Sequence, residues 1–340
     1  MSRSTRFVAL NRHLPAGRVN PEQFTLATKE LPELDADQLL LHPIAFSVDP
    51  TLRGQLTGIE GSYFQAQIPL GGAVTGIAVS EVVESRHPDH EPGQRVLSQA
   101  EWADLSVWPP RDSWMDPSPV DPRIRKPSHA LGVFGLLGGL TAYTGMIEAG
   151  RVQAGETVVV SAAAGSVGSV AGQIARISGA RVIGLAGSER KRSVLTEELK
   201  FDAALDYRAS DLAEQLRAVA PDGPDLYFDS VGGAVSQTVM NLMRRPARIV
   251  VCGLISTYDD DAAWTIGIKP LFANGLTLQG YTPLQFPDAL PAALERLIDW
   301  VERGEMVALE TERHGLESLP EAFSGLFHGE NIGKMIVTVL

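Results

Sequence analysis

The sequence has almost no cysteine, since Cys252 is the only one among 340 residues. One cysteine cannot form a disulfide within the chain, and the seven histidines are scattered without the spacing of zinc ligands. The sequence therefore predicts neither a structural nor a catalytic metal site. It also suits a protein that works in a reducing compartment.

Long apolar runs are absent as well. No stretch approaches the ~20 consecutive apolar residues of a membrane-spanning helix, and the segment from Met1 to Thr25 is polar and arginine-rich, unlike a secretory signal. The formal net charge of -12 repels nucleic acid and anionic membranes, but it still allows a small basic pocket for a phosphate group. We therefore expect a cytoplasmic protein without nucleic-acid or membrane partners.

The chain is about twice the length of a typical domain, and its texture changes near residue 130. Before that point the apolar runs are short and punctuated by Gly, Pro and Asp, which predicts a mostly β domain over residues 1–130. Residues 131–309 alternate β-branched runs with helical stretches, which predicts an α/β domain with a doubly wound parallel sheet. The strand-like run at the C-terminus suggests that residues 310–340 complete the first domain.

Within the α/β part the pattern predicts individual elements. Strands are expected at 157–161, 181–186, 204–207, 225–229 and 248–252, and helices at 167–178, 188–199, 211–219 and 291–303.

The first of these strands runs directly into a glycine turn and a helix. The segment Ala162–Gly168 matches the dinucleotide-binding fingerprint, except that Ala163 stands where the first glycine usually does. Gly165 lets the backbone approach a pyrophosphate, Gly168 lets helix and strand pack closely, and the helix N-terminus offers unpaired N–H groups. A tight turn without a ligand is the alternative, but the strand and helix on either side favour phosphate binding.

The end of the second strand decides between the two nicotinamide cofactors, because a carboxylate there binds the ribose of NAD and repels a 2′-phosphate. No carboxylate stands there, and Lys191 lies one turn into the next helix between two arginines. We therefore predict NADPH, bound at this corner by Gly187, Ser188, Lys191 and Tyr207. A solvated helix face and a structural tyrosine at the sheet edge are the alternatives.

Several motifs beyond the glycine turn occur in a recognisable order. They are Asp49–Gly54, Gly139–Tyr143, Tyr227–Gly233, Cys252–Tyr258 and Asn331–Lys334. With the glycine turn they span about residues 45–340. The chain resembles the zinc-independent medium-chain dehydrogenase/reductase family, which includes prostaglandin reductases, leukotriene B4 12-hydroxydehydrogenases, alkenal double-bond reductases and bacterial curcumin reductases.

The resemblance implies a GroES-like substrate domain and a Rossmann domain with NADP in the cleft between them, in a cytoplasmic homodimer. It assigns the pyrophosphate to Gly165, Ser166, Val167 and Gly168, the adenosine 2′-phosphate end to Lys191 and Tyr207, and the nicotinamide half to Ser230, Cys252 and Asn331. For Cys252 the alternative is a small apolar side chain at a strand end.

The resemblance also places the substrate near Thr51, Tyr63 and Tyr281. The family often has an aromatic residue where Thr51 stands and an aromatic-aliphatic segment where Tyr281-Thr282-Pro283 stands. It often has Asn where Ser230 stands. The first two departures lie where substrates touch such enzymes, so they bear on the substrate more than on the reaction.

The implied reaction is reduction of the carbon–carbon double bond of an α,β-unsaturated ketone or aldehyde. Hydride goes to the β-carbon, and a hydrogen-bond donor stabilises the enolate oxygen. Tyr258 is the predicted catalytic donor, because a neutral phenol with a pKa near ~10 donates without being consumed. A quinone reductase of the same superfamily and a non-catalytic NADPH-binding redox sensor are the alternative functions, and Tyr258 as a mere wall is the alternative for that residue.

Overall fold

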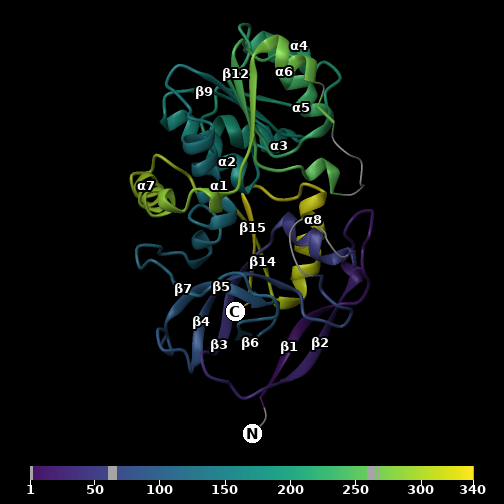
Figure 1. Cartoon of the computed structure of the whole chain (residues 1–340), viewed down its shortest axis with the longest axis vertical. Coiled ribbons are helices and arrows are strands. Elements are labelled where there is room, and N and C mark those ends of the chain that lie inside the picture. Colours follow the sequence, from purple (N-terminus) through teal and green to yellow (C-terminus); the bar gives the residue numbers. More distant parts are fainter. Residues whose placement is uncertain (1–2, 60–66, 259–264, 267, 340) are drawn as a thin grey trace. The chain divides into compact units, whose positions relative to one another are not determined.

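The computed structural model describes residues 3–59, 67–258, 265–266 and 268–339 (Figure 1). The chain divides into two compact units, each with its own sheet and core. Unit 1 consists of Met1–Leu131 and Glu310–Leu340, and unit 2 consists of Gly132–Leu309. Among the helices that the structure describes, none has the length and apolar character needed to span a bilayer.

Unit 1 is built on β-structure. A seven-stranded sheet has the order β14-β15-β3-β4-β5-β7, with β6 paired to β3, and β1 and β2 form a separate antiparallel ribbon. The elements are β1 (Arg3–Leu10), β2 (Phe24–Leu31), β3 (Leu39–Ser47), β4 (Thr75–Ser85), β5 (Arg95–Glu101), β6 (Ser106–Trp108), β7 (Ser118–Pro119), β14 (Glu310–His314), α8 (Leu319–Phe327) and β15 (Lys334–Thr338).

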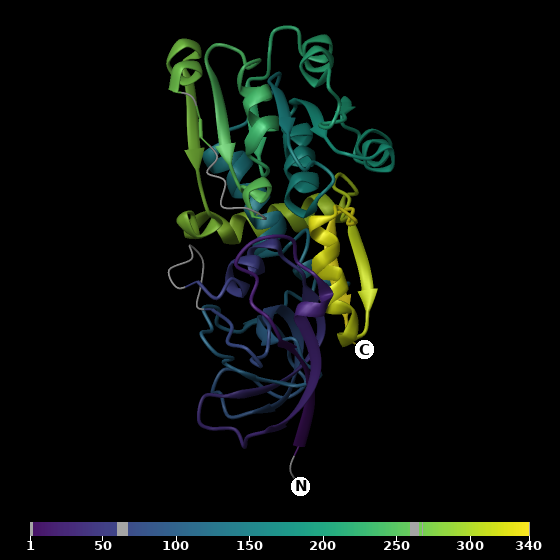
Figure 2. The ribbon, with the colours of Figure 1, turned by 90° about the vertical axis from the view of Figure 1, so that its right-hand side faces the viewer.

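The C-terminal segment of the chain belongs to this unit. Strand β15 pairs antiparallel with β3 and parallel with β14, and α8 lies beside these strands (Figure 2). The aromatic rings of Phe24, Trp102 and Phe323 meet in the core with centroids 6.2 to 6.3 Å apart. A core of this kind needs residues from both ends of the chain, so the last strand is part of the fold of unit 1.

Unit 2 has six parallel strands in the order β10-β9-β8-β11-β12-β13. Its elements are α1 (Thr141–Tyr143), β8 (Thr157–Val160), α2 (Ser166–Ile177), β9 (Arg181–Leu185), α3 (Glu189–Ser193), β10 (Ala203–Leu205), α4 (Leu212–Val219), β11 (Leu226–Asp229), α5 (Gly233–Met240), β12 (Ala247–Val251), α6 (Ile268–Asn274), β13 (Leu276–Gly280) and α7 (Leu290–Glu302).

Successive side chains of each strand point to opposite faces of this sheet, and apolar side chains cover both faces. Tyr227 packs with Val239 of α5 in one core cluster. The next residue, Phe228, faces the other way and closely approaches Gly145, in the π-helical turn after α1. The predicted α/β class with a doubly wound parallel sheet beside a mostly β region is confirmed. The strand order reverses between β8 and β11, and ligands of such sheets bind at the carboxyl ends of the strands near this point.

Candidate functional site

The turn after β8 has a left-handed residue, but it is not the one that the fingerprint suggests. Ala162 has a φ of 45°, whereas Ala163 is buried and its N–H donates to the carbonyl of Leu185 at 3.1 Å. An alanine is tolerated at 163 because its side chain packs inward, next to Gly184 of β9. The turn is therefore fixed to the neighbouring strand on one side.

Gly168 fixes the turn on its other side. A Cβ at this position would lie 2.4 Å from the carbonyl oxygen of Ala162 and 3.0 Å from the Cα of Ala163. Both are backbone atoms and cannot move aside as a flexible side chain would. A Cβ at Gly165 would lie 3.1 Å from the same oxygen. The first turn of α2 thus packs against the loop at a distance that only glycine allows.

At the N-terminus of α2, the N–H groups of residues 166–168 have no hydrogen-bond partner among the described residues. No side chain caps the helix at Gly165, and Ser166 and Val167 are only half-buried. The hydroxyl of Ser166 is buried without a hydrogen-bond partner in the part of the chain that the structure describes. Unpaired N–H groups and a free hydroxyl at a helix N-terminus suit an oxyanion such as pyrophosphate.

The corner after β9 brings together residues from two loops. Ser188 caps α3, its hydroxyl accepting from the N–H of Lys191 at 3.3 Å. A Cβ at Gly187 would lie 2.8 Å from the Tyr207 ring and 2.9 Å from Nε of Arg208. The Arg208 guanidinium lies 5.4 Å from the centroid of that ring. Arg208 was not among the predicted site residues. Its position directly after the predicted Tyr207 could have indicated it.

Lys191 is half-buried beside this second cation. Burial, and then the positive charge of Arg208, lower the pKa of Lys191. Within the described residues no carboxylate lies at ion-pair distance from Lys191. The nearby Asp206 forms its ion pair with Arg192 instead, at 2.9 Å. The charge of Arg208 repels the Lys191 ammonium, and a phosphate dianion would relieve that repulsion.

The end of β11 carries a buried carboxylate that organises the loops around it. Asp229 is fully buried and accepts five hydrogen bonds. The donors are the hydroxyls of Ser161, Tyr227 and Ser236 and the N–H groups of Val231 and Gly232. Ser161 directly follows β8, and its hydroxyl also accepts from the N–H of Ser230 at 2.8 Å. Asp229 lies in the Tyr227–Gly233 motif but was not among the predicted site residues.

Ser230 and Cys252 lie next to this carboxylate. The N–H of Cys252 donates to the main-chain oxygen of Asp229 at 2.7 Å, which holds the ends of β11 and β12 together. The hydroxyl of Ser230 is buried without a well-formed hydrogen bond among the described residues. Desolvation by the surrounding protein raises the pKa of the Cys252 thiol. The site thus offers a free hydroxyl and a protonated thiol rather than a thiolate.

Tyr281 lies in the core of unit 2. It is 7% exposed, its hydroxyl donates to the carbonyl of Thr141 at 2.6 Å, and its ring packs against Phe228. Gly145 makes this packing possible, because a Cβ there would lie 2.1 Å from the Tyr281 hydroxyl. A substrate contact by Tyr281 stays a prediction, and it would have to use part of the ring rather than the hydroxyl.

Tyr258 ends the 3-10 turn Ile255–Thr257 that follows β12, and it is half-buried. Desolvation, and then the neighbouring Cys252, raise the pKa of its phenol. The phenol therefore keeps its proton at neutral pH. Its hydroxyl makes no hydrogen bond with the residues that the structure describes.

The remaining predicted residues belong to unit 1. Thr51 lies half-buried in the 3-10 helix Pro50–Leu56, and Asn331 donates through Nδ2 to the carbonyl of Gly333 at 2.8 Å. Tyr63 lies outside the described residues. Among residues 3–59, 67–258, 265–266 and 268–339 there is no group of three His, Cys, Asp or Glu side chains able to hold a metal ion.

The chain resembles known oxidoreductases over most of its length. A model described as the N-terminal domain of oxidoreductase matches residues 6–115, and one described as zinc-binding dehydrogenase matches residues 166–302. The NADPH-dependent curcumin reductase of Escherichia coli (strain K12) is 36% identical and covers 99% of this chain and 97% of its own. The NADP(+)-dependent 2-alkenal reductase of Nicotiana tabacum is also 36% identical, over 89% of this chain and 88% of its own.

A solved structure supports the same relationship. The structure of CurA from Vibrio vulnificus in complex with NADPH is 33% identical, covers 98% of this chain and 99% of its own, and superimposes with a TM-score of 0.89. The two relatives above exceed 30% identity over nearly their whole length. The chain therefore belongs to the zinc-independent medium-chain dehydrogenase/reductase family, as its motifs predicted.

Proposed function

We propose that this protein uses NADPH to reduce the carbon–carbon double bond of α,β-unsaturated ketones or aldehydes. The observation that carries the proposal is Tyr258, a protonated phenol in the loop after β12 at the carboxyl edge of the sheet, which makes no hydrogen bond to the described residues. The names of the relatives, a curcumin reductase and a 2-alkenal reductase, point to the same reaction.

The residues of unit 2 suit NADPH at three places. The free N-terminus of α2 and the Ser166 hydroxyl would take the pyrophosphate. Lys191 and Arg208 would take the 2′-phosphate, with the Tyr207 ring beside it. The unpaired Ser230 hydroxyl would take the nicotinamide half. The CurA structure with NADPH supports this choice of cofactor.

NADPH, when bound, supplies the hydride that adds to the β-carbon of the substrate. Tyr258 donates a hydrogen bond to the carbonyl oxygen, on which negative charge develops as the enolate forms. Its raised pKa keeps the proton on the phenol, so the residue stabilises charge without being consumed. The α-carbon of the enolate then takes a proton from solvent water, which gives the saturated carbonyl compound.

Product analysis with labelled cofactor tests this proposal. Turnover of a straight-chain enone with NADPH that carries two deuterium atoms at C4 of the nicotinamide should give the saturated ketone with deuterium at the β-carbon. A saturated product without a label at that carbon, or an allylic alcohol as the product, would contradict it. Reduction of 1,4-quinones without turnover of any enone would favour the quinone reductase alternative. Tight NADPH binding without turnover of either class would favour the redox sensor.

A further inference from the structure

Strands β3 and β15 of unit 1 each adjoin a segment that carries a predicted ligand residue. The two strands pair antiparallel, and where this pairing ends the N–H of Val48 donates to the carbonyl of Met335 at 3.1 Å. The same register places Asp49 opposite Lys334. The next residue, Pro50, has no N–H, so it cannot donate to the ladder. Side chains therefore make the connection at this point.

Lys334 and Asp49 form a largely buried ion pair there. Lys334 is 2% exposed, and its ammonium binds one oxygen of the Asp49 carboxylate, while the Ser47 hydroxyl donates to the other oxygen. The Asp49 side chain does not cap the 3-10 helix Pro50–Leu56 that follows it. Desolvation of two charges is costly, and two apolar residues often stabilise such a position equally well. What an apolar pair does not supply is the fixed direction of these bonds.

The ion pair fixes the start of this 3-10 helix. Asp49 directly precedes the helix, and its carboxylate is held from β15. Arg53, which is 3% exposed, fixes the helix further along by donating to the carbonyls of Leu14 at 2.7 Å and Gly17 at 3.2 Å. Thr51, the predicted substrate residue, lies between these two anchors. Its position therefore depends on both of them.

On the other side the ion pair fixes the turn that carries Asn331, the predicted nicotinamide residue. The Asn331 amide donates to the carbonyl of Gly333 at 2.8 Å, and the N–H of Ile332 donates to the Thr311 hydroxyl at 2.9 Å. Gly333 has a φ of 70°, so the chain turns sharply into Lys334, the first residue of β15. Lys334 thus connects this turn to the helix.

We propose that Lys334 and Asp49 are positioning residues, whose ion pair sets the placement of Thr51 relative to Asn331. The expected effect on turnover rests on the proposed function, whereas the effect on cofactor binding does not. Misplacing a group that orients a substrate by about 1 Å can cost a hundred-fold in rate. An ion pair that served stability alone would be replaceable by apolar residues without such a loss.

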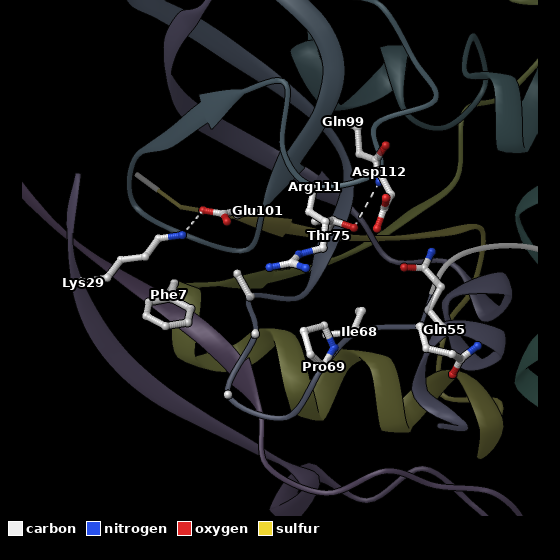
Figure 3. A pocket seen from close by; sticks show the side chains of 14 residues that line it. Phe7, Lys29, Gln55, Ile68, Pro69, Thr75, Gln99, Glu101, Arg111 and Asp112 are labelled. Atoms are coloured by element: carbon white, nitrogen blue, oxygen red, sulfur yellow. Dashed lines mark hydrogen bonds and ion pairs between the residues drawn. The ribbon is translucent and has the colours of Figure 1, made fainter. Parts of the chain in front are cut away.

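Paired substitutions separate positioning from stability. Lys334→Met and Asp49→Leu should each lower the melting temperature, because each leaves a buried charge without its partner. The double variant removes both charges and should recover most of that loss. Its kcat/KM for a straight-chain enone should still be roughly ten-fold below the wild type, through a higher KM. Lys29→Met with Glu101→Leu, at a 2.5 Å ion pair that joins β2 to β5, is the matched control and should keep the wild-type KM (Figure 3).

A more conservative variant covers the case in which the double variant does not fold. Asp49→Glu keeps both charges but lengthens the side chain by one methylene group, so it displaces the anchor without leaving a charge unpaired. It should keep most of the melting temperature and still raise the KM for the enone.

A binding experiment tests the inference without turnover. By calorimetric titration, the double variant and Asp49→Glu should bind NADPH roughly five-fold more weakly than the wild type, the loss expected for one weakened hydrogen bond from Asn331. Both should bind 2′,5′-ADP, which lacks the nicotinamide, as the wild type does. Variants that fold and keep the wild-type KM and NADPH affinity would overturn the inference. A wild type that turns over no enone would refute the proposed function, and the two titrations would still decide the inference.

Discussion

The two ends of the predicted cofactor site are built in different ways. At the phosphate loop the backbone does the work, because Gly168 leaves no room for a Cβ and the free N–H groups belong to the main chain of α2. At the corner after β9 the predicted cofactor contacts come from side chains. They are Lys191, Tyr207 and Arg208, each at least partly exposed. We therefore expect dinucleotide binding to depend on backbone packing, and the choice between NADPH and NADH to depend on replaceable side chains.

The largest effect is expected from breaking the backbone packing. Gly168→Val should lower the melting temperature sharply and abolish binding of both cofactors, because the new side chain would meet the main chain of Ala162. Overpacking of this kind costs about 1–3 kcal/mol or more. Differential scanning fluorimetry with and without cofactor measures both effects. Gly280→Ala is the control, since a Cβ there meets nothing within 4 Å. Unchanged melting and binding in the valine variant would refute the packing argument.

Asp229 joins Ser161, just before the glycine turn, to the loop after β11, where the nicotinamide half is predicted to bind. Asp229→Asn cannot accept from all five donors, and each buried group left unpaired costs about 1–3 kcal/mol. We expect NADPH affinity to fall at least ten-fold, while the affinity for 2′,5′-ADP, which lacks the nicotinamide, stays the same. Calorimetric titration with the two ligands makes the comparison. Equal losses for both would mean that Asp229 supports only the overall fold of unit 2.

The corner predicts a selective effect. Lys191→Ala should weaken NADPH ten- to a hundred-fold and leave NADH unchanged, because a charge-assisted bond contributes ~1.5–3 kcal/mol. Arg208→Ala should act in the same direction. Since burial and Arg208 lower the pKa of Lys191, NADPH affinity should also fall as rising pH removes the lysine proton. Fluorescence titration over a pH series measures both affinities. Parallel losses for the two cofactors would show that neither residue binds the 2′-phosphate.

Tyr258 should affect the rate and not the binding. Tyr258→Phe should lower kcat ten-fold or more, with the NADPH dissociation constant nearly unchanged, because the donor acts on charge that develops in the transition state. The raised phenol pKa predicts that kcat shows no loss from Tyr258 ionisation between pH 7 and about 9. Steady-state assays of the wild type and of the Tyr258→Phe variant across this pH range measure both effects. A phenylalanine variant with the wild-type kcat would show that the Tyr258 ring only lines the site and that its hydroxyl is not needed for the reaction.

Removal of metal ions is expected to have no effect. Incubation with a metal chelator should leave activity unchanged, and elemental analysis should find no stoichiometric zinc, since one cysteine and scattered histidines do not provide a ligand set. One tightly held zinc ion per chain, lost together with activity, would contradict the metal-free mechanism.

The sequence revealed those parts of the fold that depend on local pattern. The Thr157–Val160 run is strongly apolar, and the glycine turn follows it directly, so β8 and α2 were predicted within one residue. Strand β13 was not predicted, because Leu276–Gly280 is short and mostly exposed at the sheet edge. The predicted helix 188–199 is α3 followed by a π-helical turn over Val194–Glu198.

The direction in which individual side chains point could not be predicted from the sequence. Tyr281 follows a strand in a motif with a family role, but only the packed structure shows its hydroxyl bound to Thr141. Arg208 and Gly187 meet through a loop after β10, at a distance that spacing along the chain does not encode.

The ratio of kcat/KM for NADPH over NADH, measured with one straight-chain enone, tests the central claim most directly. The wild-type protein should prefer NADPH at least ten-fold, and Lys191→Ala should lose most of that preference by losing NADPH efficiency alone. A wild-type enzyme that uses both cofactors equally, or a variant that keeps the full preference, would contradict the account of how this site chooses its cofactor.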